Sequence, residues 1–285
     1  MCIRDRGIND ASTKRAIELY EPVLTRGTII PMSATAAEVT KTAENTFRDL
    51  QIAAVNQLAL YCEAMGINVY DVRAGIDSLK GDGITRAILW PGAGVGGHCL
   101  TKDTYHLERG VKLSDAALDY PAGKESLFVL ARHVNDFMPM HLFHLTTSAL
   151  ERAGREMAGA KVAVLGWAFL ANSDDARNTP SEIYRDLCLS AGAKVVVHDP
   201  YVRDYPGVPI EDDLGAVIAG ADAVAILAGH GAYRGLNAGQ VKGLCNKEMP
   251  VVVDGRNIID PDAFIRLGFV YRGIGRGDKN NHPVA

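Results

Sequence analysis

The chain has 285 residues, of which 47% are hydrophobic and 22% are charged, and its formal net charge at pH 7 is −4. A chain of this length and composition can bury a sizeable core and is expected to form two domains. The slight acidic excess argues against a basic surface that binds nucleic acid, and no apolar run is long enough to span a bilayer. We therefore expect neither a nucleic-acid partner nor a membrane.

Five cysteines are spread through the chain without a C-x-x-C pair or another metal-ligand spacing. An odd number of separated cysteines indicates free thiols, which are typical of the reducing cytoplasm. The start of the chain, MCIRDRGIND, lacks the apolar segment of a secretory signal. The sequence thus predicts a cytoplasmic protein with no metal site.

The first part of the chain, residues 7–155, has mainly helical periodicity. Apolar residues recur at helical spacing in one long segment, about 35–65, and in another, about 124–153. Helices of this length cannot bury their apolar sides within so small a domain, so we expect them to form a homodimer interface. Between them lies a glycine-rich stretch, 81–97, followed by Cys99 and a short helix.

From about residue 156 the pattern changes to strands that alternate with helices. Apolar strands are expected at 161–169, 193–200, 222–229, 249–257 and 268–275. Such an alternation over about 125 residues predicts a parallel sheet covered by helices on both faces. The predicted fold class is therefore α/β, with a helical domain followed by a small Rossmann-like domain at 156–285.

The first strand–helix turn of this second domain does not match a dinucleotide site. After Gly166, the second and third glycine positions of G-x-G-x-x-G hold Ala168 and Ala171. Two aspartates at 174–175 place negative charge where a pyrophosphate needs positive potential. We therefore predict no cofactor-binding residues here, and we assign no ribose-binding role to Asp199 at the end of a predicted strand.

Four segments of the chain resemble one enzyme family when they are taken in order. They are EVTKTAENTFRDLQIAAVNQLALYCEAMGI, PGAGVGGHCLTKD, VAVLGWAFLANSDDARNTPS, and VVVDGRNIIDP followed by FVYRGIGRG. Together they resemble the UDP-glucose/GDP-mannose dehydrogenase family, the nucleotide-sugar 6-dehydrogenases, from about Gly7 to Gly277. The resemblance covers the central helical dimerisation domain and the C-terminal nucleotide-sugar-binding domain of that family. Residues 1–6 resemble nothing in it.

The resemblance implies the catalytic and substrate-binding part of an NAD-dependent enzyme. Such an enzyme oxidises the C6 alcohol of a UDP-sugar, here UDP-ManNAc, UDP-GlcNAc or UDP-glucose, to the uronate. The N-terminal NAD-binding domain of the family has no counterpart in the sequence, so we expect a truncated product that is inactive alone. The alternative is a non-catalytic protein of the same descent that binds a nucleotide sugar or pairs with other subunits.

Cys99 is the candidate nucleophile. A cysteine in an apolar context can simply pack as a small hydrophobic side chain. Here Gly96 and Gly97 allow a ligand to approach the backbone, and the following helix start and Lys102 favour an anionic thiolate. The resemblance implies that Cys99 adds to the C6 aldehyde and then forms a thioester that water hydrolyses.

Three further residues receive catalytic roles from the resemblance. Lys41 and Asn45 are one helical turn apart and project from one face. Lys41 could also be a solvated charge between glutamates, but its match implies that it and Asn45 assist alcohol oxidation and stabilise an oxyanion at C6. Asp103 is matched to the residue that activates the hydrolytic water, and it can also stabilise the helix start.

The resemblance also implies a set of substrate-binding residues. Arg256 in the DGRN segment is matched to a sugar-nucleotide contact, and Arg86 to an arginine that reaches the substrate of the partner subunit. Gly94, Gly96 and Gly97 belong to the matched substrate loop.

The chain departs from the family pattern at Leu170, where the family commonly has a lysine that contacts the substrate. Asp175 and Arg177 keep the rest of that D-D-x-R pattern. The segment GGHC, in place of GGSC, makes the chain more similar to family members that act on UDP-N-acetylhexosamines, such as UDP-N-acetylmannosamine.

Overall fold

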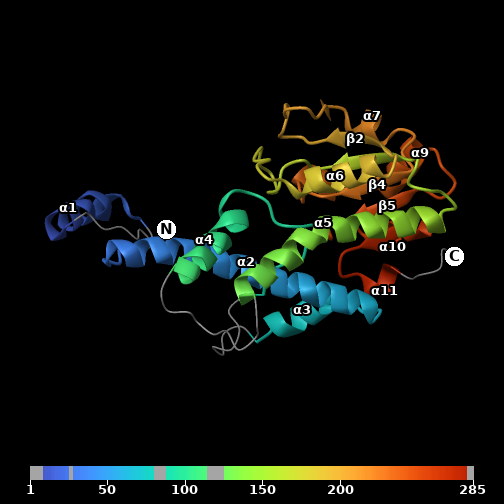
Figure 1. Ribbon diagram of the computed structural model, residues 1–285. Coiled ribbons are helices and arrows are strands. Elements are labelled where there is room, and N and C mark those ends of the chain that lie inside the picture. The colour runs from blue at the N-terminus through green and yellow to red at the C-terminus, as the bar shows by residue number, and fades with distance from the viewer. Residues whose placement is uncertain (1–8, 26–27, 80–87, 114–124, 281–285) are drawn as a thin grey trace.

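The computed structural model of the protein describes residues 9–25, 28–79, 88–113 and 125–280. Its first part is helical: α1 (Asp10–Tyr20), the 3-10 helix η1 (Glu21–Val23), α2 (Ala34–Ala64), α3 (Val69–Asp77), α4 (Cys99–Leu113) and α5 (Leu127–Arg152). Figure 1 shows α1 apart from the other elements, and none of its residues is buried. No helix in these ranges is long and apolar enough to cross a membrane.

The two long helices begin at serine caps. The side chain of Ser33 accepts a hydrogen bond from the Ala36 amide at the start of α2, and Ser126 caps α5 in the same way. Gly66, with φ of 70°, follows the end of α2, and α5 continues through Pro139. Both long helices expected from the periodicity are therefore confirmed.

A chain of buried polar contacts joins α2 to α5 and then to the glycine-rich loop. Arg132 on α5 forms a 2.6 Å ion pair with Asp49 on α2, and both side chains are inaccessible to solvent. Asn135 donates to Asp49 and accepts from Asn56, whose side-chain oxygen accepts from the Gly92 amide at 3.0 Å. Since buried polar groups are costly unless paired, these contacts specify how the helices and the loop fit together.

The second part of the chain forms a six-stranded parallel sheet in the order β3-β2-β1-β4-β5-β6. The strands are β1 (Lys161–Leu165), β2 (Lys194–His198), β3 (Ile210–Glu211), β4 (Ala223–Ile226), β5 (Val251–Asp254) and β6 (Val270–Gly273). The helices are α6 (Pro180–Ser190), α7 (Leu214–Ile218), α8 (Gly231–Arg234), α9 (Ala238–Cys245), α10 (Pro261–Arg266) and α11 (Gly277–Asn280). The predicted α/β class is confirmed, and the strand order reverses between β1 and β4.

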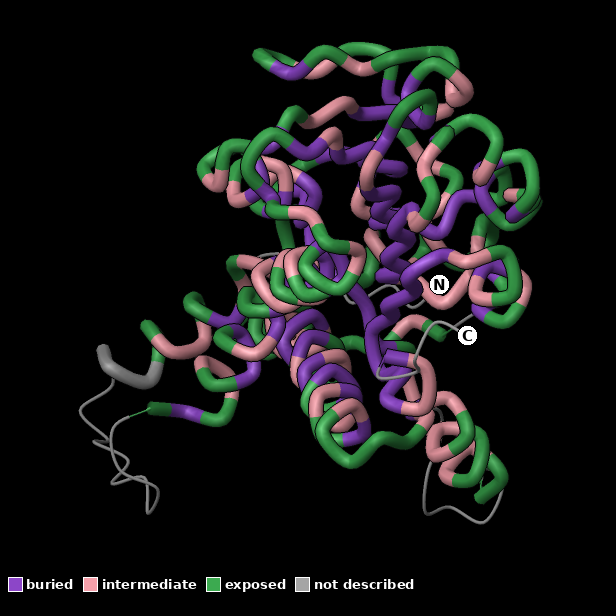
Figure 2. The backbone as a smooth tube through the Cα atoms, turned by 90° about the vertical axis from the view of Figure 1, so that its right-hand side faces the viewer, coloured by how far each residue is buried: buried purple, intermediate pink, exposed green. Residues whose placement is uncertain are grey.

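Helices cover both faces of the sheet because its strands point alternate residues to opposite sides. On β1, Val162 and Val164 join the cluster that contains α5 and α6, whereas Ala163 and Leu165 join the cluster that contains α7, α9 and α10. Figure 2 shows buried stretches running through the interior and exposed residues along the outer loops and helix faces.

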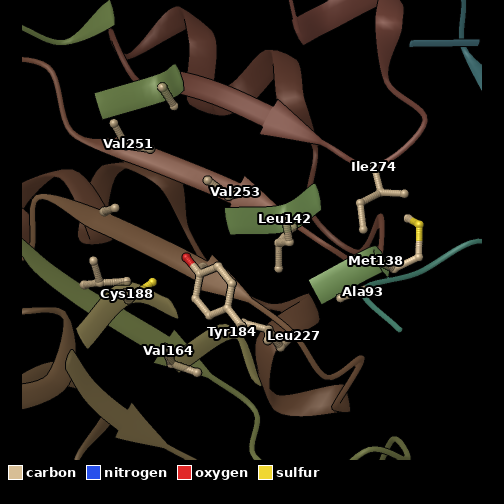
Figure 3. Close-up of a cluster of buried hydrophobic side chains, with 14 of the residues drawn as sticks. Ala93, Met138, Leu142, Val164, Tyr184, Cys188, Leu227, Val251, Val253 and Ile274 are labelled. Carbon is tan, nitrogen blue, oxygen red and sulfur yellow. The ribbon is translucent and has the colours of Figure 1, made fainter. Parts of the chain in front are cut away.

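Helix α5 packs against the sheet as well as against α2. In Figure 3, Met138 and Leu142 of α5 lie beside Val253 of β5 and Ile274, and Ala93 of the glycine-rich loop joins them. The two halves of the chain therefore share one hydrophobic cluster. The expected boundary near residue 155 falls between α5 and β1 and stays a prediction.

Candidate active site

Cys99 is the first residue of α4, and it is exposed. The loop before it is held by Gly97, whose φ of 86° is a conformation that favours glycine. The Gly97 amide donates to the carbonyl of Arg177 at 2.8 Å, and its own carbonyl accepts from the Asn178 side chain at 3.1 Å. This reciprocal pair fixes the segment before α6 against the loop and presents the thiol to solvent at a helix start.

Gly96 is needed for close packing. A Cβ atom at this position would lie 2.5 Å from the Cβ of Phe169, so no larger residue fits there without rearrangement. Gly94 packs in a similar way against Pro139 and Pro180. The predicted substrate-loop glycines therefore let the loop pack between α5 and the start of α6.

Two of the predicted catalytic side chains are in direct contact. Asn45 Nδ2 on α2 donates a 2.6 Å hydrogen bond to Asp103 Oδ2 on α4. Asp103 is one helical turn beyond Cys99, so α4 places the carboxylate on the same side as the thiol. Lys41 is exposed, and its ammonium lies 3.5 Å from Glu44 on the same helix. The catalytic roles of these four residues stay predictions.

Arg177 is a charged neighbour of Cys99 that the sequence-based set of site residues omitted. Its guanidinium forms a 2.5 Å ion pair with Asp175. The hydrogen bonds that Arg177 donates to Asp175 raise the pKa of Arg177, and electrostatic attraction to Cys99 adds to this effect. The D-D-x-R pattern could have indicated Arg177 as a site residue. Its position near Cys99 follows from the packing of this segment on Gly97, whose amide donates to the Arg177 carbonyl.

A first cavity, of about 340 Å³, opens at the carboxyl edge of the sheet. Its lining comes from the loops after β1, β4 and β5, from the last residue of α8 and from the glycine-rich stretch: Trp90, Pro91, Ala171, Gly229, Arg234, Arg256, Asn257 and Ile258. These loops flank the reversal of strand order between β1 and β4, the place where open α/β sheets bind ligands.

A second cavity, of about 350 Å³, joins the helical part to the sheet domain. It is lined by Arg48, Ile52, Trp90, Gly92, Gly94, Val95, Gly96, Leu100, Phe169, Leu170 and Arg256. It therefore contains the glycine loop and the residue next to Cys99. Trp90 and Arg256 line both cavities, so the two are adjacent across these side chains.

Arg256 follows β5, and its guanidinium forms no hydrogen bond or ion pair with any residue that the structure describes. Burial lowers the pKa of Arg256, and nearby Asp254 opposes this effect. A Cβ atom at Gly92 would lie 2.7 Å from its Nη1, so a glycine there leaves room for the side chain. A sheltered cation without a carboxylate partner is suited to an anionic ligand. The remaining predicted contact, Arg86, lies outside the described residues.

The sheet domain does not fit NAD. The amides of Trp167 and Ala168, which follow β1 where a pyrophosphate would bind, both donate to Asp199 Oδ2, at 2.6 and 2.9 Å. Helix α6 starts at Pro180, and the hydroxyl of Ser181 in its first turn donates to the Gly166 carbonyl at 2.8 Å. His230 Nδ1 accepts from the Asn172 amide, so its Nε2 carries the proton that is donated to Asp199. Asp199 is thus a buried acceptor of hydrogen bonds within the domain. That it has no ribose-binding role stays a prediction.

Two models of one family match this chain. The model of the UDP-glucose/GDP-mannose dehydrogenase family central domain matches residues 35–126, and the model of the UDP binding domain of that family matches residues 163–261. The second cavity contains residues from both matched regions, and most of the lining of the first comes from the UDP binding domain.

Individual proteins similar to this chain agree with these matches. The UDP-N-acetyl-D-mannosamine dehydrogenase of Pyrococcus horikoshii is 37% identical over 95% of this chain and 59% of its own length. The UDP-glucose 6-dehydrogenase of Pseudomonas aeruginosa is 30% identical over 91% of this chain and 57% of its own. The crystal structure of the NDP-N-acetyl-D-galactosaminuronic acid dehydrogenase of Methanosarcina mazei Go1 has a TM-score of 0.93 and 70% identity, covering 98% of this chain and 59% of that one.

The chain thus spans somewhat less than three fifths of the length of these relatives, and the matched parts are the central and UDP binding domains. Three findings agree with membership of this family: the order of the two domains, the helical and parallel-sheet architecture, and the high similarity over nearly the whole chain. This chain belongs to the UDP-glucose/GDP-mannose dehydrogenase family.

Proposed function

We propose that this chain is the catalytic and substrate-binding part of a nucleotide-sugar 6-dehydrogenase that acts on a UDP-sugar. The observation that carries the proposal is the position of Arg256 on the wall between two adjacent cavities. One cavity belongs largely to the UDP binding domain, and the other reaches the loop that precedes Cys99. In this arrangement the diphosphate contacts Arg256, and the sugar extends toward the thiol.

In the proposed reaction, Cys99 acts on the C6 carbon of the sugar. Its thiolate adds to a C6 aldehyde to form a thiohemiacetal, and oxidation of that adduct leaves a thioester. Water then attacks the thioester carbonyl, which releases the uronate and returns the thiol. The exposure of Cys99 at the start of a helix supports this role, because the site is accessible and its potential favours an anion.

Asn45, Lys41 and Asp103 receive supporting roles in the same proposal. Asn45 and Lys41 stabilise negative charge that develops on the C6 oxygen. Asp103 accepts a proton from the hydrolytic water. The hydrogen bond between Asn45 and Asp103 supports this division, because it holds the two side chains next to each other.

Two oxidations are needed: that of the C6 alcohol to the aldehyde, and that of the thiohemiacetal to the thioester. Each transfers a hydride to an acceptor, which in this family is NAD. The described residues do not fit NAD, so we place its binding site in another part of the full-length enzyme. We also propose that the enzyme is a homodimer through α2 and α5, which expose large apolar side chains. The 285-residue chain alone should therefore bind UDP-sugars without reducing NAD, as an NADH absorbance assay can check.

Binding of UDP tests the proposal directly. Isothermal titration of the chain with UDP should give saturable binding, and Arg256→Met should weaken it at least about tenfold because a charge-assisted contact is lost. Arg203→Met is the matched control, since Arg203 is exposed and lies outside both cavities. Absence of UDP binding, or the same affinity in the Arg256 variant, would contradict the proposed site.

A further inference from the structure

Arg48 is a cation of the second cavity to which the proposed chemistry assigns no role. It lies on α2, three residues after Asn45, and its side chain is 57% exposed. Glu44 Oε1 is 3.5 Å from its Nη2, which is the outer limit of a hydrogen bond. Glu44 therefore orients the guanidinium without removing it from contact with a ligand.

The order of the two cavities indicates which part of a ligand meets Arg48. A nucleotide sugar consists of a nucleoside, a diphosphate and a sugar, in that order. With the nucleoside in the first cavity and the diphosphate at Arg256, the sugar occupies the second cavity, where Arg48 and Leu100 are part of the lining. This step rests on the function proposed above.

The second cavity has an unusual combination of lining side chains. Its polar side chains are the guanidinium groups of Arg48 and Arg256 and the indole of Trp90, all of which only donate hydrogen bonds. Ile52, Leu100, Val95, Phe169 and Leu170 make the rest of the side-chain lining apolar. Such a lining suits a substituent that combines a carbonyl acceptor with an apolar group, whereas a hydroxyl is a weaker acceptor and has no apolar group to pack there.

We propose that Arg48 determines specificity for the sugar by donating to the acetamido carbonyl of a UDP-linked 2-acetamido hexose. The acetamido methyl then packs against apolar side chains such as Ile52 and Leu170. A 2-hydroxy sugar offers neither this carbonyl nor the methyl, so it binds more weakly. Arg48 is a binding residue in this proposal and takes no part in the chemical steps at Cys99.

Titration calorimetry of the 285-residue chain can test whether Arg48 determines the preference for acetamido sugars. The probes are UDP, UDP-GlcNAc with its 2-hydroxy counterpart UDP-glucose, and UDP-GalNAc with UDP-galactose. The unmodified chain should bind at least one acetamido sugar about tenfold more tightly than its counterpart, as expected for a hydrogen bond to a charged group. Arg48→Leu should reduce this preference to about twofold or less while leaving the affinity for UDP unchanged. Arg48→Lys should give an intermediate preference, because it keeps the charge and loses the planar fork.

The outcomes separate this inference from the function on which it rests. Unchanged affinity for UDP shows that the Arg48 variant is folded, and Arg203→Leu controls for the loss of an arginine elsewhere. An equal loss of affinity for UDP and for all sugars would assign Arg48 to the diphosphate and overturn the proposal. Binding of UDP without any acetamido preference, or a preference that survives Arg48→Leu, would overturn it too. Failure of the unmodified chain to bind UDP would instead refute the proposed function, and this inference with it.

Discussion

Asn45 on α2 and Asp103 on α4 are joined by a 2.6 Å hydrogen bond between Nδ2 and Oδ2, although 58 residues separate them in the sequence. Asn45 is buried and Asp103 is half-buried, so water competes little for this contact. The bond connects the long helix that carries the predicted oxidation residues to the helix that begins with Cys99.

A double-mutant cycle should detect this bond. We expect Asn45→Ala and Asp103→Ala to be coupled by about 1 kcal/mol in the free energy of unfolding, because each single change removes the same contact. Urea denaturation of the four proteins measures the coupling. The pair Glu44 and Arg48, whose 3.5 Å contact is exposed, is the comparison and should be coupled more weakly. Strict additivity of the Asn45 and Asp103 changes would contradict the observed contact.

Cys99 should be the first of the described cysteines to react with iodoacetamide. Burial raises the pKa of Cys188 to about 12 and that of Cys245 to about 11, and it also raises the pKa of Cys62. These thiols stay protonated at pH 8, and they are also shielded from the reagent. Peptide mapping after limited modification measures the order in which the cysteines react. Cys2, which lies outside the described residues, is followed as a separate peptide.

Two additions make the labelling experiment specific for the proposed site. A bound UDP-sugar should slow modification of Cys99 and leave Cys2 unaffected. Arg177→Gln should slow modification of Cys99 at neutral pH, because the variant lacks a nearby positive charge that favours the thiolate. If Cys99 reacts no faster than the buried cysteines and UDP-sugars do not protect it, the nucleophile assignment is wrong.

Asp199 should make the protein sensitive to acid. Burial favours the protonated form, but hydrogen bonds from His230 and from the amides of Ala168, Val202 and Tyr201 outweigh it and lower the pKa of Asp199 to about 2. Since the unfolded carboxyl titrates near 4, the resulting stabilisation is complete above about pH 4 and is lost as the pH falls toward 2. It amounts to about 2 kcal/mol.

Asp199→Asn tests that expectation. The variant should be less stable than the unmodified chain by about 2 kcal/mol or more at pH 7, with a smaller difference at pH 2.5. Urea denaturation at several pH values measures the difference in the free energy of unfolding at pH 7 and at pH 2.5. Asp204→Asn, at an exposed aspartate, is the control and should change stability little. A difference between Asp199→Asn and the unmodified chain that is the same at both pH values would show that Asp199 contributes by packing and not by its charge.

The predicted homodimer rests on apolar side chains that α2 and α5 leave exposed. Phe47 and Tyr61 on α2 and Leu130 and Phe137 on α5 are each more than two fifths exposed in the single chain. Large exposed apolar patches typically mark interfaces. Phe137→Glu should convert a dimer at micromolar concentration into a monomer in sedimentation equilibrium, whereas Leu244→Glu, on the exposed side of α9, should not. A monomeric unmodified chain would contradict the prediction.

Several features of this protein could be predicted from the sequence because they depend on local order. Helical periodicity over about 30 residues predicted α2 and α5, and alternating apolar segments predicted β1, β2, β4, β5 and β6. The residues after Gly166 argued against a dinucleotide site. The glycines before Cys99 were expected to let a ligand approach the backbone, and the structure shows Gly96 and Gly97 packed closely against Phe169. The two-residue strand β3 and the helices α8, α9, α10 and α11, none longer than eight residues, were not predicted, since such elements have too few residues for a clear periodic signal and are stabilised by tertiary packing.

The assembly of the site was decided by the tertiary structure. The order of residues in the chain could not reveal that Asn45 meets Asp103 or that the Arg177 carbonyl pairs with the Gly97 amide near Cys99. Nor could it reveal that Arg256 lies beside Gly92 at the junction of two cavities. Secondary structure follows from the repeat of residues along the chain, which is a property of neighbours. Contacts between distant segments depend instead on how α5 packs at once on α2 and on the sheet, and on the buried polar chain from Asp49 to Gly92, so they exist only when the whole core has formed.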